Sequence, residues 1–190
     1  MKQMEEMILR EGKALPGNVL KVGSFLNQKI DTRLLREISR EVARLYANDN
    51  ITKILTVESS GIAIATGVGL EMGVPVVFAK KHKTSNVDGS TFASTVHSYT
   101  HNMDYRMIVS RDYLCSRDRV LLVDDFLANG NALNGLMDLV SQAGAWLAGA
   151  AIAIEKGFQG GGDTLRSQGL RVESLAIIDS MEGGQIRFRP

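Results

Sequence analysis

Apolar runs alternate with amphipathic stretches along most of the chain after residue 50. Five runs are apolar or β-branched over most of their length, which is typical of strands buried on both faces. Between several of them, apolar residues recur at helical spacing. Strands and helices that alternate in this way predict an α/β fold, with a mostly parallel twisted sheet flanked by helices. The predicted strands span 51–57, 74–80, 120–125, 147–156 and 171–179, and the predicted helices span 62–72, 131–143 and 163–168.

The first 50 residues follow a different pattern. Apolar residues share one face of a predicted helix over 1–10. The segment 19–27, "VLKVGSFLN", is short, apolar and interrupted by glycine, so it predicts a strand that leads into a turn. Asp31 can cap a second helix, which the apolar spacing extends to about Ala47.

Residues 80–111 break the alternation of strands and helices. Polar Thr, Ser, His and Asn residues alternate loosely there with Phe92, Val96 and Tyr99. We expect an antiparallel excursion from the sheet, with a mobile loop near 85–89. A long polar insertion at the carboxyl end of a strand is more often functional or disordered than structural.

The composition is that of one ordinary globular domain over residues 1–190, with 44% apolar and 23% charged residues. The 22 Lys and Arg residues nearly balance the 21 Asp and Glu residues, so nucleic acid is not an expected partner. No run approaches the ~18 apolar residues of a membrane span, and the acidic N-terminal segment does not resemble a signal peptide. The single cysteine, Cys115, excludes an intramolecular disulfide and suits a reducing compartment. We therefore expect a cytoplasmic protein.

The stretch "VLLVDDFLANGNAL" (120–133) is the most unusual part of the chain. Asp124 and Asp125 end an apolar strand, and small residues open the next helix. Ligands of an open parallel sheet bind beyond the carboxyl ends of its strands, where these acids stand. Small residues at a helix N-terminus let backbone N–H groups approach an anion. Because acids would repel a phosphate, they should face hydroxyl groups or a metal ion; the alternative is that they only cap the helix and solvate the sheet edge.

Two other strand ends offer related chemistry. "VESSGIA" (57–63) opens a helix with N–H groups and two hydroxyls that suit an anion, although an ordinary serine-capped helix is the alternative. "AIEKGF" (153–158) ends a strand with Glu155, Lys156 and Phe158, which offer a donor and a ring that could stack on a flat ligand. A salt bridge at the edge of the sheet is the alternative there. Together, the three ends imply a ligand with two phosphate groups, a sugar and a flat heterocycle.

These motifs resemble the type I phosphoribosyltransferase family. The stretch 120–133 resembles its motif for phosphoribosyl diphosphate (PRPP), with four apolar residues, two acids and a small-residue loop. "VLKVGSFLNQKID", "VESSGIA", "VFAKKHK" and "IEKGFQ" are similar to the bacterial members that act on xanthine, so the resemblance covers the whole chain. The wider family usually has threonines in the loop, where this chain has Ala128, Asn129, Asn131 and Ala132. That departure narrows the resemblance to the xanthine members and their purine-repressor relatives.

The resemblance implies an activity and an architecture. The activity is transfer of the 5-phosphoribosyl group from PRPP to N9 of xanthine, giving XMP and pyrophosphate in purine salvage. The architecture is a type I phosphoribosyltransferase fold with a small N-terminal hood (about 1–30) and a flexible excursion (about 80–111), assembled as a homodimer. Mg²⁺ is implied as cofactor, bound mainly through PRPP. Two alternatives stay open: guanine or hypoxanthine as the base, or a PRPP-sensing transcription regulator, although no helix-turn-helix or basic stripe is evident.

The resemblance also implies which positions bind each part of the substrates. By hydrogen-bond polarity, Lys156 would donate to the 6-oxo group, which adenine lacks, and Asn27 would donate to the 2-oxo group of xanthine. The acids would accept hydrogen bonds from the ribose hydroxyls. The implied residues are Asp124, Asp125 and Lys81 for catalysis; Leu20, Asn27 and Lys156 for xanthine; Ala128, Asn129, Gly130, Asn131 and Ala132 for the 5′-phosphate; and Glu58, Ser59, Ser60, Gly61, Lys80 and Lys83 for the pyrophosphate.

Overall fold

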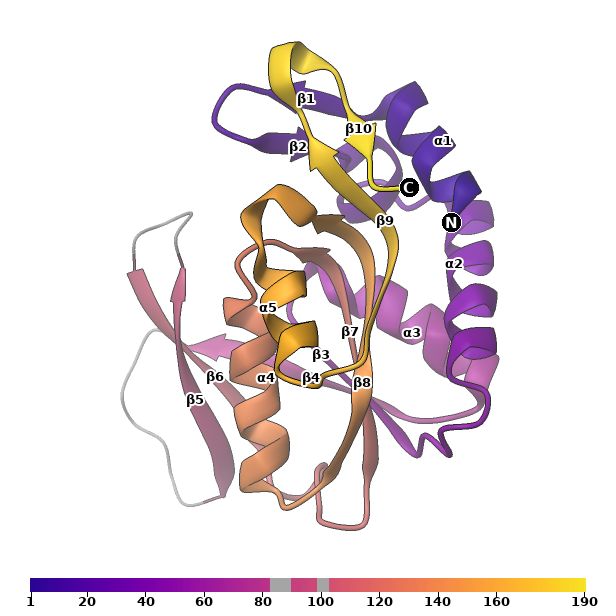
Figure 1. The fold of residues 1–190 in the computed structure, drawn as a ribbon. Coiled ribbons are helices and arrows are strands. Elements are labelled where there is room, and N and C mark those ends of the chain that lie inside the picture. Colours follow the sequence, from indigo (N-terminus) through magenta and orange to yellow (C-terminus); the bar gives the residue numbers. More distant parts are fainter. Residues whose placement is uncertain (83–89, 99–102) are drawn as a thin grey trace.

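An eight-stranded, mostly parallel sheet forms the centre of the protein (Figure 1). The computed structural model describes residues 1–82, 90–98 and 103–190. Neighbouring strands are parallel from β9 through β8, β7 and β3 to β4, and antiparallel strands extend both edges. This arrangement confirms the predicted fold class. In order across the sheet, the strands are β10 (Arg187–Phe188), β9 (Val172–Ser180), β8 (Trp146–Lys156), β7 (Arg119–Leu127), β3 (Lys53–Val57), β4 (Val76–His82), β6 (Met103–Ser110) and β5 (Thr91–Ser98).

Helices cover both faces of the sheet, which explains why its central strands are apolar throughout (Figure 1). Ile54 and Leu121 face a first apolar cluster with the helices α2 and α3, whereas the adjacent Leu55 and Leu122 face a second cluster with α4. The helices are α1 (Lys2–Glu11), α2 (Thr32–Leu45), α3 (Ser60–Met72), α4 (Asn131–Gln142) and α5 (Gly161–Ser167).

The predicted helix ends are confirmed where their local chemistry is strong. The Asp31 carboxylate accepts hydrogen bonds from the backbone N–H groups of Arg33 (2.9 Å) and Leu34 (3.1 Å), which caps α2 as expected. Helix α3 ends at Gly73, whose φ of 69° lies in the left-handed region that glycine tolerates best.

The N-terminal hood (residues 1–30) differs from its prediction in detail. The predicted strand from residue 19 is only β2 (Val19–Lys21), which pairs with a short strand, β1 (Lys13–Leu15), that was not predicted. A π-helical turn, Gly23–Asn27, follows and buries Phe25 and Leu26 in the first apolar cluster. The hood lies over the carboxyl-terminal end of the parallel strands (Figure 1).

The excursion after β4 is an antiparallel hairpin, as predicted. β4 pairs with β6, and β6 pairs with β5 over its whole length. Val96 of this hairpin packs against Gly135 of α4, where an added β carbon would stand 2.4 Å from the Val96 side chain. The mobile loop expected near 85–89 lies outside the described residues. Within the described ranges, no helix is both long and apolar enough to cross a membrane.

Candidate active site

A cavity of about 510 Å³ opens at the carboxyl ends of β7 and β8, beneath the hood. Its walls come from segments that are far apart in the sequence. They are the hood turn at 17–19, the end of β7 with the loop that leads into α4 (126–133), Lys156 and Gln159 after β8, and His97 and Tyr105 from the β5–β6 hairpin. The volume is that of a small-molecule site.

Asp124 and Asp125 lie near the end of β7, beside this cavity, and point to opposite faces of the sheet, as adjacent strand residues do. Asp124 is buried, and its Oδ1 accepts a hydrogen bond from the Asp125 backbone N–H at 2.9 Å. Asp125 is half-buried and faces the hood, where the Asn27 amide donates to its Oδ2 at 3.5 Å. Burial, reinforced by the Asp125 charge, holds the pKa of Asp124 well above its usual range.

The loop between β7 and α4 presents backbone rather than side-chain donors. Gly130 precedes α4 with a φ of 87°, and no side chain caps the first turn of this helix. The Asn131 amide does not point its donor at that turn but donates to the His97 carbonyl at 2.9 Å, which ties the loop to the hairpin. Gly161 packs so closely on the other side that an added β carbon would stand 2.2 Å from the Ala128 carbonyl oxygen. The loop is therefore held from both sides, and it lines the cavity at the N-terminal end of α4.

A second loop of this kind follows β3. The N-cap of α3, Ser59, makes no side-chain capping bond, and the peptide bond that joins it to Glu58 is cis. The Glu58 carboxylate accepts a hydrogen bond from the Lys81 backbone N–H at 2.5 Å, so it fixes the end of β4. Gly61 lies against Asp124: an added β carbon would stand 2.8 Å from its Oδ1 and 2.3 Å from Thr56 Oγ1. The loop at 58–61 thus adjoins Asp124.

Two of the three lysines predicted at the site, Lys80 and Lys81, point to opposite faces of β4. Lys81 directs its ammonium over the Tyr105 ring, 5.4 Å from its centroid, and its charge also acts on Asp124. Lys80, on the opposite face of β4, lines a separate apolar cavity with Phe78 and Ile108, so the structure does not bring it to the acids. Lys83 lies outside the described residues.

Of the predicted base-binding residues, Lys156 lines the cavity and Leu20 does not. Lys156 Nζ donates to the Asn18 carbonyl at 2.8 Å and lies 5.6 Å from the centroid of the Phe126 ring, so it closes the cavity toward the hood. Burial lowers its pKa. Leu20 is buried in the first apolar cluster and does not belong to the cavity wall. Phe126 and Tyr105 line the cavity, whereas Phe158, the ring predicted from the sequence, does not.

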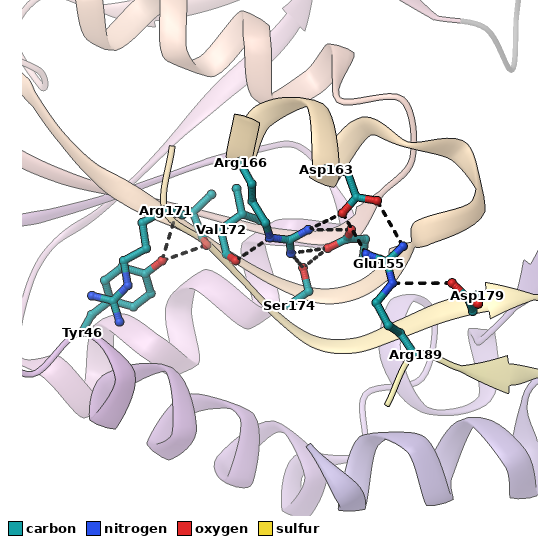
Figure 2. A network of polar contacts seen from close by, with 10 residues as sticks. Tyr46, Glu155, Asp163, Arg166, Arg171, Val172, Ser174, Asp179 and Arg189 are labelled. Carbon is teal, nitrogen blue, oxygen red and sulfur yellow. Dashed lines mark hydrogen bonds and ion pairs between the residues drawn. The ribbon is translucent and has the colours of Figure 1, made fainter. Parts of the chain in front are cut away.

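Glu155 points into a polar network with Arg166 and Ser174 (Figure 2). Its carboxylate is fully buried and binds the Arg166 guanidinium of α5 through two hydrogen bonds of 2.9 and 2.7 Å. Ser174 of β9 donates to the same carboxylate at 2.5 Å. Arg166 also contacts Asp163, which the C-terminal Arg189 binds in turn. The salt bridge considered from the sequence therefore exists, but it lies inside the protein.

Several residues of the site were not predicted from the sequence. Phe126 directly follows the two acids, so its position offered a signal. Tyr105 comes from the hairpin, whose register the sequence does not give, and Gln159 sits in an irregular turn after β8. Thr56 is the last but one residue of an apolar strand, where threonine is easily taken for an ordinary β-branched core residue.

Known proteins are similar to this chain over nearly its whole length. A family model described as the phosphoribosyl transferase domain matches residues 22–183. A protein named xanthine phosphoribosyltransferase from Limosilactobacillus reuteri is 48% identical over 99% of this chain and 98% of its own length. One of the same name from Lachnoclostridium phytofermentans is 51% identical, covering 100% and 98%. Among solved structures, an adenine phosphoribosyltransferase from Giardia lamblia with 9-deazaadenine superposes with a TM-score of 0.77 at 22% identity, over 92% of this chain and 96% of its own.

Proposed function

Since the chain belongs to the phosphoribosyl transferase domain family, we propose that it transfers the 5-phosphoribosyl group from PRPP to N9 of xanthine and releases pyrophosphate. Relatives named for this reaction, 48% and 51% identical over almost their whole length, support it. Residues 1–190 would act as a single catalytic domain. The observation that carries the proposal is that Asp124 and Asp125 lie near the end of β7 and are followed, after a short loop, by the N-terminus of α4, which no side chain caps.

PRPP would lie across the two loops. Its 5′-phosphate would accept hydrogen bonds from the backbone N–H groups of residues 128–132, because no side chain caps that turn. Asp124 and Asp125 would accept hydrogen bonds from the ribose 2′- and 3′-hydroxyls. The loop at 58–61 adjoins Asp124 and would bind the pyrophosphate, with Lys81 as the cation on the same side.

In the reaction, the bond from ribose C1 to pyrophosphate breaks while N9 of the base bonds to C1 from the opposite side and gives up its proton to water. Positive charge develops on the sugar and negative charge on the leaving group. The protein needs no nucleophile of its own: it holds both partners in line, which can contribute ~7–11 kcal/mol, and stabilises the departing charge with preorganised donors. The 58–61 N–H groups and Lys81 are the described groups placed for that second task.

Mg²⁺ fits this arrangement as a cofactor carried by PRPP. It favours oxygen ligands and keeps several of its waters, so a site with few protein ligands suits it. The described residues contain no group of three or more His, Cys, Asp or Glu side chains that could hold a metal without the substrate. When bound with PRPP, the ion would neutralise the pyrophosphate; neither acid is proposed as its direct ligand.

The base would lie against Phe126, between the hood and the end of β8. Lys156 would exchange its present acceptor, the Asn18 carbonyl, for the 6-oxo group of the purine. Asn27, which now donates to Asp125, would turn its amide to the 2-oxo group. Leu20 would act indirectly: its side chain packs in the first apolar cluster and so holds β2, the strand next to the hood turn, in place.

We also propose a homodimer in the cytoplasm. A second cavity, of about 670 Å³, is lined by residues of β4 and β6 and of the segment that follows β6. Two apolar side chains in its lining are exposed, Phe78 (41%) and Tyr113 (61%). A second copy of the chain would cover these side chains. Light scattering after size-exclusion chromatography would give the mass of the assembly directly.

The decisive experiment is kcat/KM for xanthine, guanine, hypoxanthine and adenine with PRPP and Mg²⁺. We expect xanthine to be the preferred base. Adenine should be rejected by ~10⁴-fold, because its 6-amino group meets the Lys156 donor. A preference for guanine or hypoxanthine would support the proposed reaction but reject xanthine as the preferred base. No nucleotide from any of the four bases would contradict the proposal.

A further inference from the structure

Thr56 is the last but one residue of β3, and its hydroxyl is buried without a partner. The side chain is 0% exposed, and Oγ1 makes no hydrogen bond among the described residues. A buried hydroxyl that lacks a partner destabilises a folded protein, since it has lost its hydrogen bonds to water. In native structures such groups are rare and often reflect a role in another state of the protein.

The neighbours of this hydroxyl belong to the proposed PRPP site. A β carbon at Gly61 would stand 2.3 Å from Thr56 Oγ1 and 2.8 Å from Asp124 Oδ1, so both oxygens flank the same α carbon. Thr56 therefore lies in the protein interior, next to the loop at 58–61 and close to Asp124. A hydroxyl in this place can donate to a carboxylate but is too deeply buried to touch substrate itself.

We propose that Thr56 is a positioning residue, whose hydroxyl donates to Asp124 when PRPP is bound and holds this carboxylate toward the ribose. The proposal rests on the proposed function, since it needs Asp124 to accept a hydrogen bond from the sugar. The groups that face Asp124 are otherwise Asp125 on the same strand, Lys81 on β4 and Tyr105 on β6. Among these groups, only the charge of Lys81 stabilises the ionised form of Asp124. A hydroxyl from β3 that donates to the carboxylate would stabilise that form further.

The test is a Thr56→Val substitution, which keeps the shape and removes the hydroxyl. Without ligand, the variant should melt a few degrees higher, because an unpartnered buried polar group is replaced by an apolar one. With PRPP, its kcat/KM should fall roughly 10- to 100-fold, the size expected for one hydrogen bond to a charged group. A more stable yet less active protein is a result that a purely structural role would not give.

Two further variants test whether the hydroxyl of Thr56 itself is responsible for the loss. Thr56→Ser restores the hydroxyl and should return kcat/KM to within about threefold of the parent. Thr66→Val makes the same chemical change on the exposed face of α3, where Oγ1 donates to the Ile62 carbonyl at 2.7 Å, and should leave the kinetics unchanged. Parent-like activity in Thr56→Val, or a loss that Thr56→Ser does not rescue, would overturn the inference.

The two proposals fail in different ways. If the parent protein makes no nucleotide, the proposed function fails, and the rise in melting temperature produced by PRPP alone then tests Thr56. A smaller rise in Thr56→Val than in the parent and in Thr66→Val would keep the positioning role. An equal rise in all three proteins, or none in the parent, would reject it.

Discussion

Gly61 lies so close to Asp124 that the two residues leave no space for a side chain between them. An added β carbon would stand 2.8 Å from Asp124 Oδ1 and 2.3 Å from Thr56 Oγ1, distances that real β carbons do not adopt. Gly61→Ala should therefore push the 58–61 loop away from the acid. A shift of about 1 Å at a reacting centre can cost ~10²-fold, so we expect kcat/KM for PRPP to fall by about that factor. Steady-state kinetics with varied PRPP would measure it.

Gly23→Ala is the matched control for that substitution. Its nearest neighbours all belong to the flexible Gln28 side chain, at 3.3 Å or more, so the added methyl can be accommodated. We expect this variant to keep its activity. If Gly61→Ala also keeps normal PRPP kinetics, the close contact has no functional meaning.

Lys80 and Lys81 should behave differently although they are adjacent in the sequence. Lys81 acts on Asp124, whereas Lys80 lines the cavity on the other face of the sheet. Lys81→Met removes a cation from the leaving group and should lower kcat by ~10²–10³-fold. Lys80→Met should stay within about twofold of the parent in the same assay. Equal losses in the two variants would show that the excursion rearranges on binding.

The alternation of side chains along a strand is enough, from the sequence alone, to place these two lysines on different faces. Side chains at adjacent strand positions point to opposite faces, and the same rule correctly predicts that Asp124 and Asp125 diverge. The order of the main strands and helices is equally predictable, because burial on both faces makes the central strands apolar throughout. The pairing of segments that lie far apart in the chain cannot be predicted in this way. Tyr105 reaches the site through the register of the β5–β6 hairpin, and Asn27 through the folding of the hood onto β7.

The stability of the ligand-free protein should depend on the ionisation of Asp124. Burial and the Asp125 charge raise its folded-state pKa above the usual 3.8. A raised pKa means that the folded state binds the proton more tightly, so the stabilisation is complete below pH ~4 and is lost as pH rises through the folded-state pKa. Asp124→Asn cannot ionise and should escape this loss. Its melting temperature relative to the parent should therefore increase between pH 5 and pH 9.

An Asp138→Asn variant provides the comparison, since Asp138 is an exposed carboxylate on α4. Its melting temperature should follow the parent at every pH. A constant offset between Asp124→Asn and the parent from pH 5 to pH 9 would contradict the raised pKa. The Asp124→Asn protein should also bind PRPP weakly, because an amide has one acceptor oxygen where the carboxylate has two.

The choice between xanthine and guanine should depend on Asn27. Its amide lies 3.5 Å from Asp125 Oδ2, and we expect it to exchange this acceptor for the base. Asn27→Ala removes a donor to the 2-oxo group and should reduce the xanthine-to-guanine ratio of kcat/KM, by roughly 10-fold if one hydrogen bond is lost. An unchanged ratio would reject the assignment. Lys156→Met should instead lower kcat/KM for both bases together, since both present a 6-oxo group.

The buried pair of Glu155 and Arg166 should matter for stability more than for chemistry. Both carboxylate oxygens bind the guanidinium, and the carboxylate has no exposed surface (Figure 2). Arg166→Met would leave a buried charge without its cation, which typically costs ~3–5 kcal/mol. Urea unfolding would measure that loss. Adding Glu155→Met should recover most of it, because two apolar side chains leave no charge to solvate. Arg44→Met breaks an exposed pair with Glu41 and should change stability little. A double variant as unstable as Arg166→Met alone would show that packing around α5, rather than the buried charge, sets the cost.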